Sequence, residues 1–93
     1  MTLIITRRIK AECEEVHKEW LQRIQAACAA SPGYVKRKVY APSGVLAADN
    51  DFWTHVVTFD SLENAKLWTT SAKCTELWQE VRPWVAEESM GFV

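Results

Sequence analysis

The fold is decided by residues 52–68, which read FWTHVVTFDSLENAKLW. Phe52 to Phe59 are mostly β-branched or aromatic and carry almost no charge, which predicts a strand that is covered on both faces. Asp60–Ser61 then begins a helix, and Asp60 stands three residues before Glu63, the spacing of a capping box. A strand and a capped helix therefore follow one another here without an intervening loop.

The elements on either side of this stretch complete a β-α-β-β-α order with a short final strand. Strands are indicated by alternation or by β-branched residues, and helices by apolar residues at three- and four-residue steps. Before the stretch we predict a strand over Leu3 to Ile9, a helix over Ala11 to Ala30, a strand over Tyr34 to Tyr40 and a loop over Ala41 to Asp51. After it we predict a helix break at Thr69–Ser71, a second helical segment ending near Arg82–Pro83 and a strand over Ser89 to Val93.

This order predicts an α+β fold with an antiparallel sheet, the ferredoxin-like βαββαβ arrangement, in a single domain over residues 1–93. In the second strand, alternation places Val35, Arg37 and Val39 on one face. The helices can cover only one face of the sheet. Because the other face also carries apolar residues, we expect a second copy of the chain to cover it, sheet against sheet, as a dimeric α+β barrel.

The composition fits that fold and excludes several classes of protein. Of the 93 residues, 48% are hydrophobic and 25% charged, as in an ordinary globular domain. Five tryptophans, with only three glycines and three prolines, exclude a disordered chain. No apolar run approaches the ~20 residues that a membrane span needs. A net charge of −1 argues against a nucleic-acid-binding protein, which must neutralise phosphates.

The cysteines indicate a reducing compartment. Cys13, Cys28 and Cys74 are odd in number and contain no close pair, so they make a poor disulfide framework. Two arginines follow the first apolar residues, which is the wrong order for a secretory signal. We therefore expect a cytoplasmic protein. Cys13 and His17 share a helix face, but two ligands do not make a metal site, so we predict no metal.

Two histidines are candidates for chemistry in the layer between the sheet and the helices. His55 shares a strand face with Val57 and Phe59, which are expected to face the helices. His17 lies on the apolar face of the first helix and points to the same layer. An imidazole with its ordinary pKa suits proton transfer near neutral pH. For each of them, a partly buried structural histidine is the alternative interpretation.

Several segments of the chain carry a resemblance to a known family. They are ITRRIK at 5–10, EWL at 19–21, SPGY at 31–34, and VTFDSLENAKLW at 57–68 with Ser71 three residues later. Together, over Leu3 to about Trp84, they resemble the antibiotic biosynthesis monooxygenase superfamily of dimeric α+β barrels. The resemblance implies a homodimer with a pocket between the sheet and the helices of each subunit. Some members oxygenate polyketide-derived phenols or anthrones without metal, flavin or haem, because the deprotonated substrate itself reduces O₂.

In such a pocket His55 would be the catalytic base or an anchor for the substrate. Asn64 and Trp68 share a helix face, where the amide can hydrogen-bond a phenolate and the indole can stack on a flat ring. The alternatives are helix-start hydrogen bonding for Asn64 and core packing for Trp68. Trp53 is a further substrate-binding candidate, with core or dimer packing as its alternative, and His17 is another.

Three arginines can bind an anion. Alternation places Arg7 and Arg8 on opposite faces of the first strand, so at most one of these two points into the layer. We include Arg7 among the substrate-binding candidates. Solvation at the surface is the interpretation given to the others, including Arg37.

The resemblance therefore implies a cofactor-independent monooxygenase that acts with O₂ on a small aromatic substrate, phenol-like or anthrone-like. A non-catalytic dimeric barrel that binds a small molecule, or serves as an interaction module, is the second hypothesis, because fold alone does not determine function. A haem-binding or haem-degrading relative is the third. It is disfavoured, since the position of the axial His in the haem-degrading members falls at about Trp78, and that of their first-strand Asn at Thr6 or Arg7.

Overall fold

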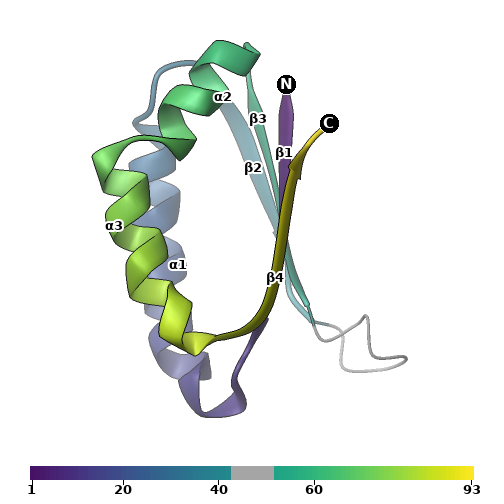
Figure 1. The fold of residues 1–93 in the computed structure, drawn as a ribbon, viewed down its shortest axis with the longest axis vertical. Coiled ribbons are helices and arrows are strands. Elements are labelled where there is room, and N and C mark those ends of the chain that lie inside the picture. The colour runs from purple at the N-terminus through teal and green to yellow at the C-terminus, as the bar shows by residue number, and fades with distance from the viewer. Residues whose placement is uncertain (43–51) are drawn as a thin grey trace.

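Four antiparallel strands form one sheet, and the helices of the described residues lie against one of its faces (Figure 1). The computed structural model describes residues 1–42 and 52–93. Its elements in chain order are β1 (Thr2–Ile9), the 3-10 turn η1 (Ala11–Cys13), α1 (Glu14–Ala29), β2 (Tyr34–Tyr40), β3 (Trp53–Phe59), α2 (Leu62–Thr69), α3 (Ala72–Val81), the 3-10 turn η3 (Arg82–Trp84) and β4 (Val85–Phe92). The strand order is β2-β3-β1-β4. The predicted ferredoxin-like α+β fold is confirmed.

The apolar core fills the layer between the sheet and the helices. Trp20 of α1 is fully buried there, and its indole N–H donates to the carbonyl of Leu77 on α3 at 2.8 Å. A buried indole N–H needs such a partner, and this one ties the two longest helices together. The core residues besides Trp20 come from β1, β3 and the three α-helices: Leu3, Ile5, Ile24, Cys28, Val57, Phe59, Ala65, Trp68, Cys74, Leu77 and Val81.

The turn that leads into β2 packs against the start of α2. Gly33 has a φ of +76°, and a Cβ atom there would lie 2.4 Å from Asp60 Oδ1, so only glycine fits. Ser61 caps α2, because its hydroxyl accepts a hydrogen bond from the Asn64 N–H at 3.1 Å. The capping box predicted for Asp60 and Glu63 is therefore wrong, since Ser61 occupies the N-cap position.

The helix break predicted at Thr69–Ser71 is present. Ser71 is the N-cap of α3 and accepts a hydrogen bond from the Cys74 N–H at 3.1 Å. The first helix differs slightly from expectation, because residues 11–13 form a 3-10 turn before the α-helix begins at Glu14. No helix among the described residues is both long enough and apolar enough to cross a membrane.

The second strand departs from the simple alternation predicted for it. Its register with β3 shifts near its start, so that Tyr34 pairs with Phe59 and Arg37 pairs with Val57. The Tyr34 ring packs on the core, whereas Val35 is 55% exposed. The prediction that Val35 shares the face of Arg37 is therefore wrong, because the irregularity shifts the alternation by one residue.

The last strand is longer than the sequence indicates. β4 spans Val85–Phe92 rather than 89–93, and it pairs with β1 from Leu3 to Ile9. Almost all its residues are exposed, so its side chains carry no apolar alternation that would reveal it. Of the loop predicted over 41–51, residues 43–51 lie outside the described range, and the two before them belong to no helix or strand.

Candidate functional site

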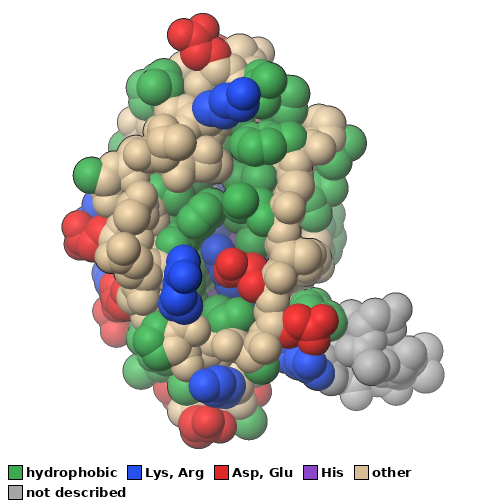
Figure 2. Space-filling view, viewed as in Figure 1, with side chains coloured by type: hydrophobic (Ala, Val, Ile, Leu, Met, Phe, Trp, Pro, Cys, Tyr) green, Lys and Arg blue, Asp and Glu red, His purple; other side chains and the backbone are tan. Residues whose placement is uncertain are grey.

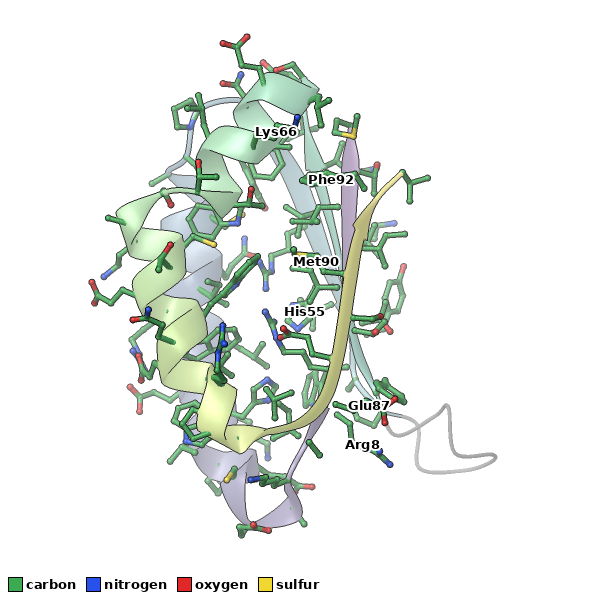
Figure 3. All side chains as sticks on the ribbon, viewed as in Figure 1. Arg8, His55, Lys66, Glu87, Met90 and Phe92 are labelled. Atoms are coloured by element: carbon green, nitrogen blue, oxygen red, sulfur yellow. The ribbon has the colours of Figure 1, made fainter. Side chains whose placement is uncertain are left out.

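A cluster of cationic and imidazole side chains interrupts the apolar core. This inner cluster consists of Arg7 from β1, His17 from α1, Arg37 from β2 and His55 from β3. Arg7 follows Leu3 and Ile5 on the inward face of its strand, since alternate residues share a face. Arg7 is 1% exposed, and both histidines are 0% exposed. Figure 3 shows His55 pointing from the sheet toward the helices.

The hydrogen bond between Arg37 and His55 determines where the imidazole carries its proton. Arg37 Nη2 lies 2.6 Å from His55 Nδ1. A guanidinium can only donate, so Nδ1 must accept and the ring proton belongs on Nε2. His55 Nε2 is buried and has no hydrogen-bond partner among the described residues. The inner cluster therefore presents an unused N–H donor inside the layer.

His55 is held neutral by its surroundings. Burial, followed by the charges of Arg37 and Arg7 and the presence of His17, lowers the pKa of His55 to about 2. An imidazole whose pKa is this low is a very weak proton acceptor at neutral pH. Its chemistry in this place is donation from Nε2.

His17 lies among aromatic rings on the helix side of the layer. Its ring stacks on Trp20 with 5.8 Å between centroids and meets the edge of Trp53 at 4.9 Å. Burial, with a smaller contribution from Arg7, lowers the pKa of His17 to about 4. Neither ring nitrogen has a hydrogen-bond partner among residues 1–42 and 52–93.

Arg7 joins the buried layer to the surface. Its guanidinium carbon lies over the rings of Trp20 and Trp78, 5.3 and 5.6 Å from their centroids. Its Nε donates to Glu88 on β4 at 2.5 Å, and the Glu88 side chain is 45% exposed. Burial lowers the pKa of Arg7 and Glu88 opposes that shift, but an arginine keeps its charge at neutral pH in either case. The buried positive charge of Arg7 therefore contacts a carboxylate, Glu88, that is itself exposed to solvent.

The thiols beside the cluster are chemically quiet. Burial raises the pKa of Cys28, although the neighbouring Arg37 opposes the shift. Burial is also the main cause that raises the pKa of Cys74 to about 12. A thiolate, not a thiol, is the nucleophile and the metal ligand, so neither cysteine offers that chemistry near neutral pH.

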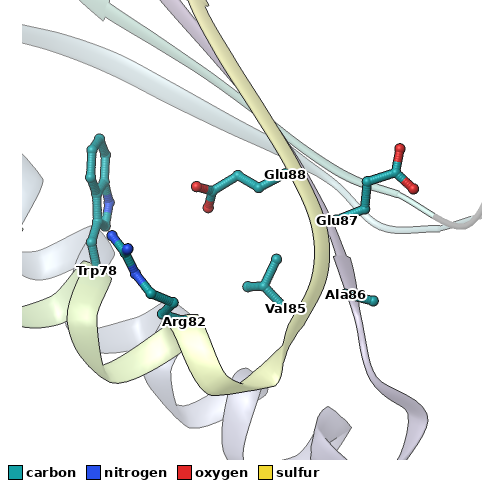
Figure 4. Close-up of a pocket in the computed structure, with 6 residues that line it drawn as sticks. All are labelled: Trp78, Arg82, Val85, Ala86, Glu87 and Glu88. Atoms are coloured by element: carbon teal, nitrogen blue, oxygen red, sulfur yellow. The ribbon is translucent and has the colours of Figure 1, made fainter.

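A cavity of about 260 Å³ opens beside Arg7, between the end of α3 and the start of β4. It is lined by Trp78, Arg82, Val85, Ala86, Glu87 and Glu88. In Figure 4 the side chains of Arg82 and Glu88 reach into this space, whereas that of Glu87 is directed to the other side of β4. Figure 2 shows basic and acidic groups meeting in the hollow between the helices and β4. The cavity thus leads to the Arg7–Glu88 ion pair.

A second hollow, of about 600 Å³, runs beside Arg8, Pro42 and Trp53.

Solved structures with the same architecture share little sequence with this chain. A candidate antibiotic biosynthesis monooxygenase from Nitrosomonas europaea matches with a TM-score of 0.80 at 16% identity, over 97% of this chain and 84% of that one. SnoaB, a cofactor-independent oxygenase from Streptomyces nogalater, matches with a TM-score of 0.79 at 10% identity, over 99% and 90% of the two chains. A dimeric ferredoxin-like protein of unknown function from Thermobifida fusca gives 0.79 at 15%, over 97% and 85%.

This chain has the fold of the antibiotic biosynthesis monooxygenase superfamily. The fold named from the sequence is confirmed by structural similarity over nearly the whole chain. Neither a family model nor a curated protein matches the sequence itself.

The predicted site residues fall into two groups. Arg7, His17, Trp53 and His55 come together around the inner cluster. Trp53 contacts His17 directly, and the charge of Arg7 lowers the pKa of both histidines. This group combines Arg7, Trp53 and His55 of the sheet with His17 of α1 in the layer between the sheet and the helices.

The second group belongs to α2, which lies at the other end of the molecule from the cavity (Figure 1). Asn64 uses its side-chain amide to donate to Asp60 Oδ1 at 2.8 Å, next to Gly33. Trp68 is 3% exposed and belongs to the apolar core. Neither residue lines the cavity beside Arg7.

Sequence reasoning missed two members of the candidate site. Arg37 was assigned to the solvated surface, yet its Nη2 contacts His55 and its Nε is buried without a partner among the described residues. Glu88 is not among the candidate site residues that the sequence suggests. A signal for Glu88 exists, because Arg7–Arg8 and Glu87–Glu88 become cross-strand charge pairs once the two strands are paired antiparallel.

Proposed function

We propose that this protein is a cofactor-independent monooxygenase that acts on a small aromatic substrate, phenol-like or anthrone-like, with O₂. The observation that carries the proposal is a hydrogen-bond donor of the inner cluster that has no acceptor among the described residues. This donor is the Nε2–H of His55, and the hydrogen bond from Arg37 to Nδ1 is what places the ring proton on Nε2. Similarity of fold to SnoaB, itself a cofactor-independent oxygenase, supports the same reaction class.

The proposed chemistry needs a site that stabilises a phenolate. An aromatic alcohol loses its proton more readily where the resulting anion meets hydrogen-bond donors and positive charge. The His55 Nε2–H and the Arg37 guanidinium supply the donors, and Arg7 adds a second positive charge in the same layer. Such preorganised donors act strongly when water is excluded. His55 serves here as an anchor rather than as the base, because its pKa is about 2.

The proton must leave through a group that exchanges with solvent. Glu88 is the carboxylate that contacts the inner cluster, and its half-exposed position at the cavity opening lets it pass a proton to water. The resulting anion is electron-rich and reduces O₂. In an anthrone-like substrate the ring CH₂ becomes C=O. One atom of O₂ is bonded to that carbon and the other leaves as water, so the substrate supplies all four electrons.

The cavity limits the size of the substrate. An engineered apolar cavity of about 150 Å³ binds benzene, and drug-sized ligands occupy roughly 300–1,000 Å³. A volume of about 260 Å³ between these limits suits one ring or two fused rings. Trp78 supplies a flat apolar wall against which such a ring can stack.

A homodimer in the cytoplasm is the assembly that we propose for this protein. The helices leave the outer face of the sheet uncovered (Figure 1), and that face carries Ile4, Val56 and Tyr40. A relative in fold from Thermobifida fusca is dimeric. We expect light scattering to give twice the chain mass of 10.6 kDa, and Val56→Asp to give the single-chain mass. A monomeric wild type would remove this part of the proposal.

Oxygen consumption tests the proposed reaction directly. Uptake would be measured with a panel of anthrones and hydroquinones in the presence of a chelator, for the wild type and for His55→Ala. Removing one donor to a developing oxyanion typically costs about 10²–10³-fold in rate, and a loss of this size is expected for His55→Ala. Lys73→Ala, on the exposed side of α3, is the control and should retain the wild-type rate.

A second substitution separates the two roles of His55. His55→Gln keeps an N–H donor near the position of Nε2 but cannot act as a base. If His55 anchors the anion, this variant keeps most of the activity that His55→Ala loses. Equal loss in both variants would assign proton removal to His55 and contradict the anchor role.

Small-molecule binding without chemistry is the second candidate function. It is favoured by the low basicity of both buried histidines, because neither can remove a proton efficiently near pH 7. Binding of the aromatic panel without any oxygen consumption would select this function over the first.

A further inference from the structure

The inner cluster is short of negative charge. It contains the guanidinium groups of Arg7 and Arg37, and the one carboxylate that contacts either of them among the described residues is Glu88. That contact is made to Arg7 alone. The Nη2 atom of Arg37 instead contacts the neutral imidazole of His55, which carries no negative charge. Arg37 is partly buried, and its Nε atom is shielded from solvent. Because a charge removed from water ordinarily has an anionic partner, the cluster can accept one more negative charge.

The cluster is also short of hydrogen-bond acceptors. Arg37 Nε and His55 Nε2 are buried N–H donors without a partner in the described part of the chain. His17 adds one more unpaired donor, because a neutral imidazole carries a proton on only one of its two nitrogens. A carboxylate offers two oxygens and about four lone-pair sites but no donor. An acceptor-only group of this kind satisfies these donors, whereas a neutral alcohol provides a single oxygen that also carries a proton.

The walls beside the cluster select a flat ligand. The rings of Trp20 and Trp78 both lie close to the Arg7 guanidinium, and Trp78 also lines the cavity of about 260 Å³. A planar ring placed against Trp78 can bring a substituent to the plane of the guanidinium. Arginine recognises a carboxylate through two parallel hydrogen bonds in that plane.

Glu88 occupies this position in the structure. Its carboxylate holds Arg7 Nε, and it reaches into the cavity from the edge strand β4 (Figure 4). Because the Glu88 side chain is half-exposed, it can turn toward solvent without losing its hydration. An incoming carboxylate can therefore take over the guanidinium while Glu88 moves into water.

We propose that the ligand of this site is a one- or two-ring aromatic carboxylate, whose carboxylate group displaces Glu88 from Arg7. Glu88 is then a built-in competitor that keeps Arg7 paired when the site is empty. The proposal rests on the site described for the proposed function, and it specifies the substrate class. It does not depend on the oxygenation step.

Anaerobic binding measurements test the ligand class. Titrations of 2-naphthoate, 2-naphthalenemethanol and cyclohexanecarboxylate would be followed by tryptophan fluorescence and by calorimetry. The naphthoate is expected to bind at least tenfold more tightly than either of the other two, because they lack the charge or the flat ring. Inorganic phosphate and chloride are included as simple anions. Equal affinity for the alcohol, or displacement of the naphthoate by millimolar phosphate, overturns the proposal.

Glu88→Gln and Glu87→Gln form a matched pair for the role of Glu88. Both remove one negative charge from neighbouring positions on β4, but the Glu87 side chain is directed to the other face of the sheet and pairs with Arg8. Glu88→Gln is expected to raise the affinity for 2-naphthoate about tenfold, because the competing carboxylate is gone, whereas Glu87→Gln leaves the affinity within about twofold. Equal effects of both substitutions contradict displacement of Glu88.

Arg7→Met completes the test, with melting temperature and circular dichroism used to verify the fold. It should abolish the preference for the naphthoate over the alcohol while leaving weak ring binding. The outcomes also separate this inference from the proposed reaction. Selective naphthoate binding without oxygen uptake retains the ligand class and removes the oxygenase. Oxygen uptake with neutral phenols, without any preference for carboxylates, does the reverse.

Discussion

Two arginine–glutamate pairs join β1 to β4 one residue apart, and they lie on opposite faces of the sheet. Arg7 pairs with Glu88 and Arg8 with Glu87, each with 2.5 Å between nitrogen and oxygen. On the inner face the Arg7 side chain is 2% exposed, whereas on the outer face the Arg8 side chain is 41% exposed. The two pairs have the same chemistry and nearly the same position along the chain, and they differ in their surroundings.

The difference shows that the environment of an ion pair, rather than its geometry, determines its role. An exposed pair is worth about 0–1 kcal/mol, because water competes for both charges and salt screens them. A buried charge that loses its partner is far more costly, and the site around it becomes selective for anions. Arg7 also packs against two indoles, so its contribution combines charge and contact area. The inner face is thus the part of the sheet suited to bind a ligand.

Lowering the pH should have the largest effect on stability, and that effect should come from the two buried histidines on the inner side of the sheet. Burial lowers the pKa of His17 to about 4 and of His55 to about 2, whereas both titrate near 6.5 in the unfolded chain. Between these values the unfolded state binds more protons, so the free energy of unfolding falls as pH falls below about 6.5. The two histidines together should cost at most about 4 kcal/mol between pH 7 and pH 5.

Urea denaturation at a series of pH values measures this effect. His17→Phe should make the dependence shallower by up to about 1.4 kcal/mol per pH unit between pH 6 and pH 5, because one proton fewer is taken up on unfolding. Lys18→Gln, next to it on the exposed side of α1, should leave the slope unchanged. An unchanged slope in His17→Phe would show that His17 is already protonated in the folded state.

Truncation of the two arginines gives the next largest contrast. Arg7→Ala removes a buried side chain that packs against Trp20 and Trp78 and should lower the free energy of unfolding by about 3 kcal/mol, similar to other large-to-small changes in cores. Arg8→Ala should cost less than about 1 kcal/mol. Chemical denaturation at fixed protein concentration measures both, since a dimer makes stability depend on concentration.

A third variant divides the cost of Arg7→Ala into packing and charge. Arg7→Met keeps most of the side-chain volume and leaves Glu88 free to turn into water, so it should recover at least half of the lost stability. If Arg7→Met is as unstable as Arg7→Ala, the ion pair with Glu88 dominates, and the contribution assigned here to packing is wrong.

The sequence predicted those strands and helices in which apolar side chains recur every second residue or every three to four residues. Alternation in β3 placed His55 on the inward face, and the apolar stripe of the first helix placed His17 there. Alternation in β1 showed only that Arg7 and Arg8 lie on opposite faces. The edge strand β4 is held mainly by backbone pairing with β1, so its side chains show no such period and half of it was missed. The contact of Arg7 with Glu88 spans 81 residues, and no local pattern records it. The bulge in β2 likewise arises from its register with β3.

High salt should give the smallest difference and separate the two faces once more. At about 1 M ionic strength the screening length is about 3 Å, so exposed charges hardly interact beyond contact. The stability lost in Arg8→Ala should therefore shrink toward zero between 0.05 and about 1 M sodium chloride, a change of a few tenths of a kcal/mol. The loss in Arg7→Ala should change much less, because packing against indoles is not screened. Equal salt dependence in both variants would mean that water and ions reach the Arg7 guanidinium as freely as that of Arg8.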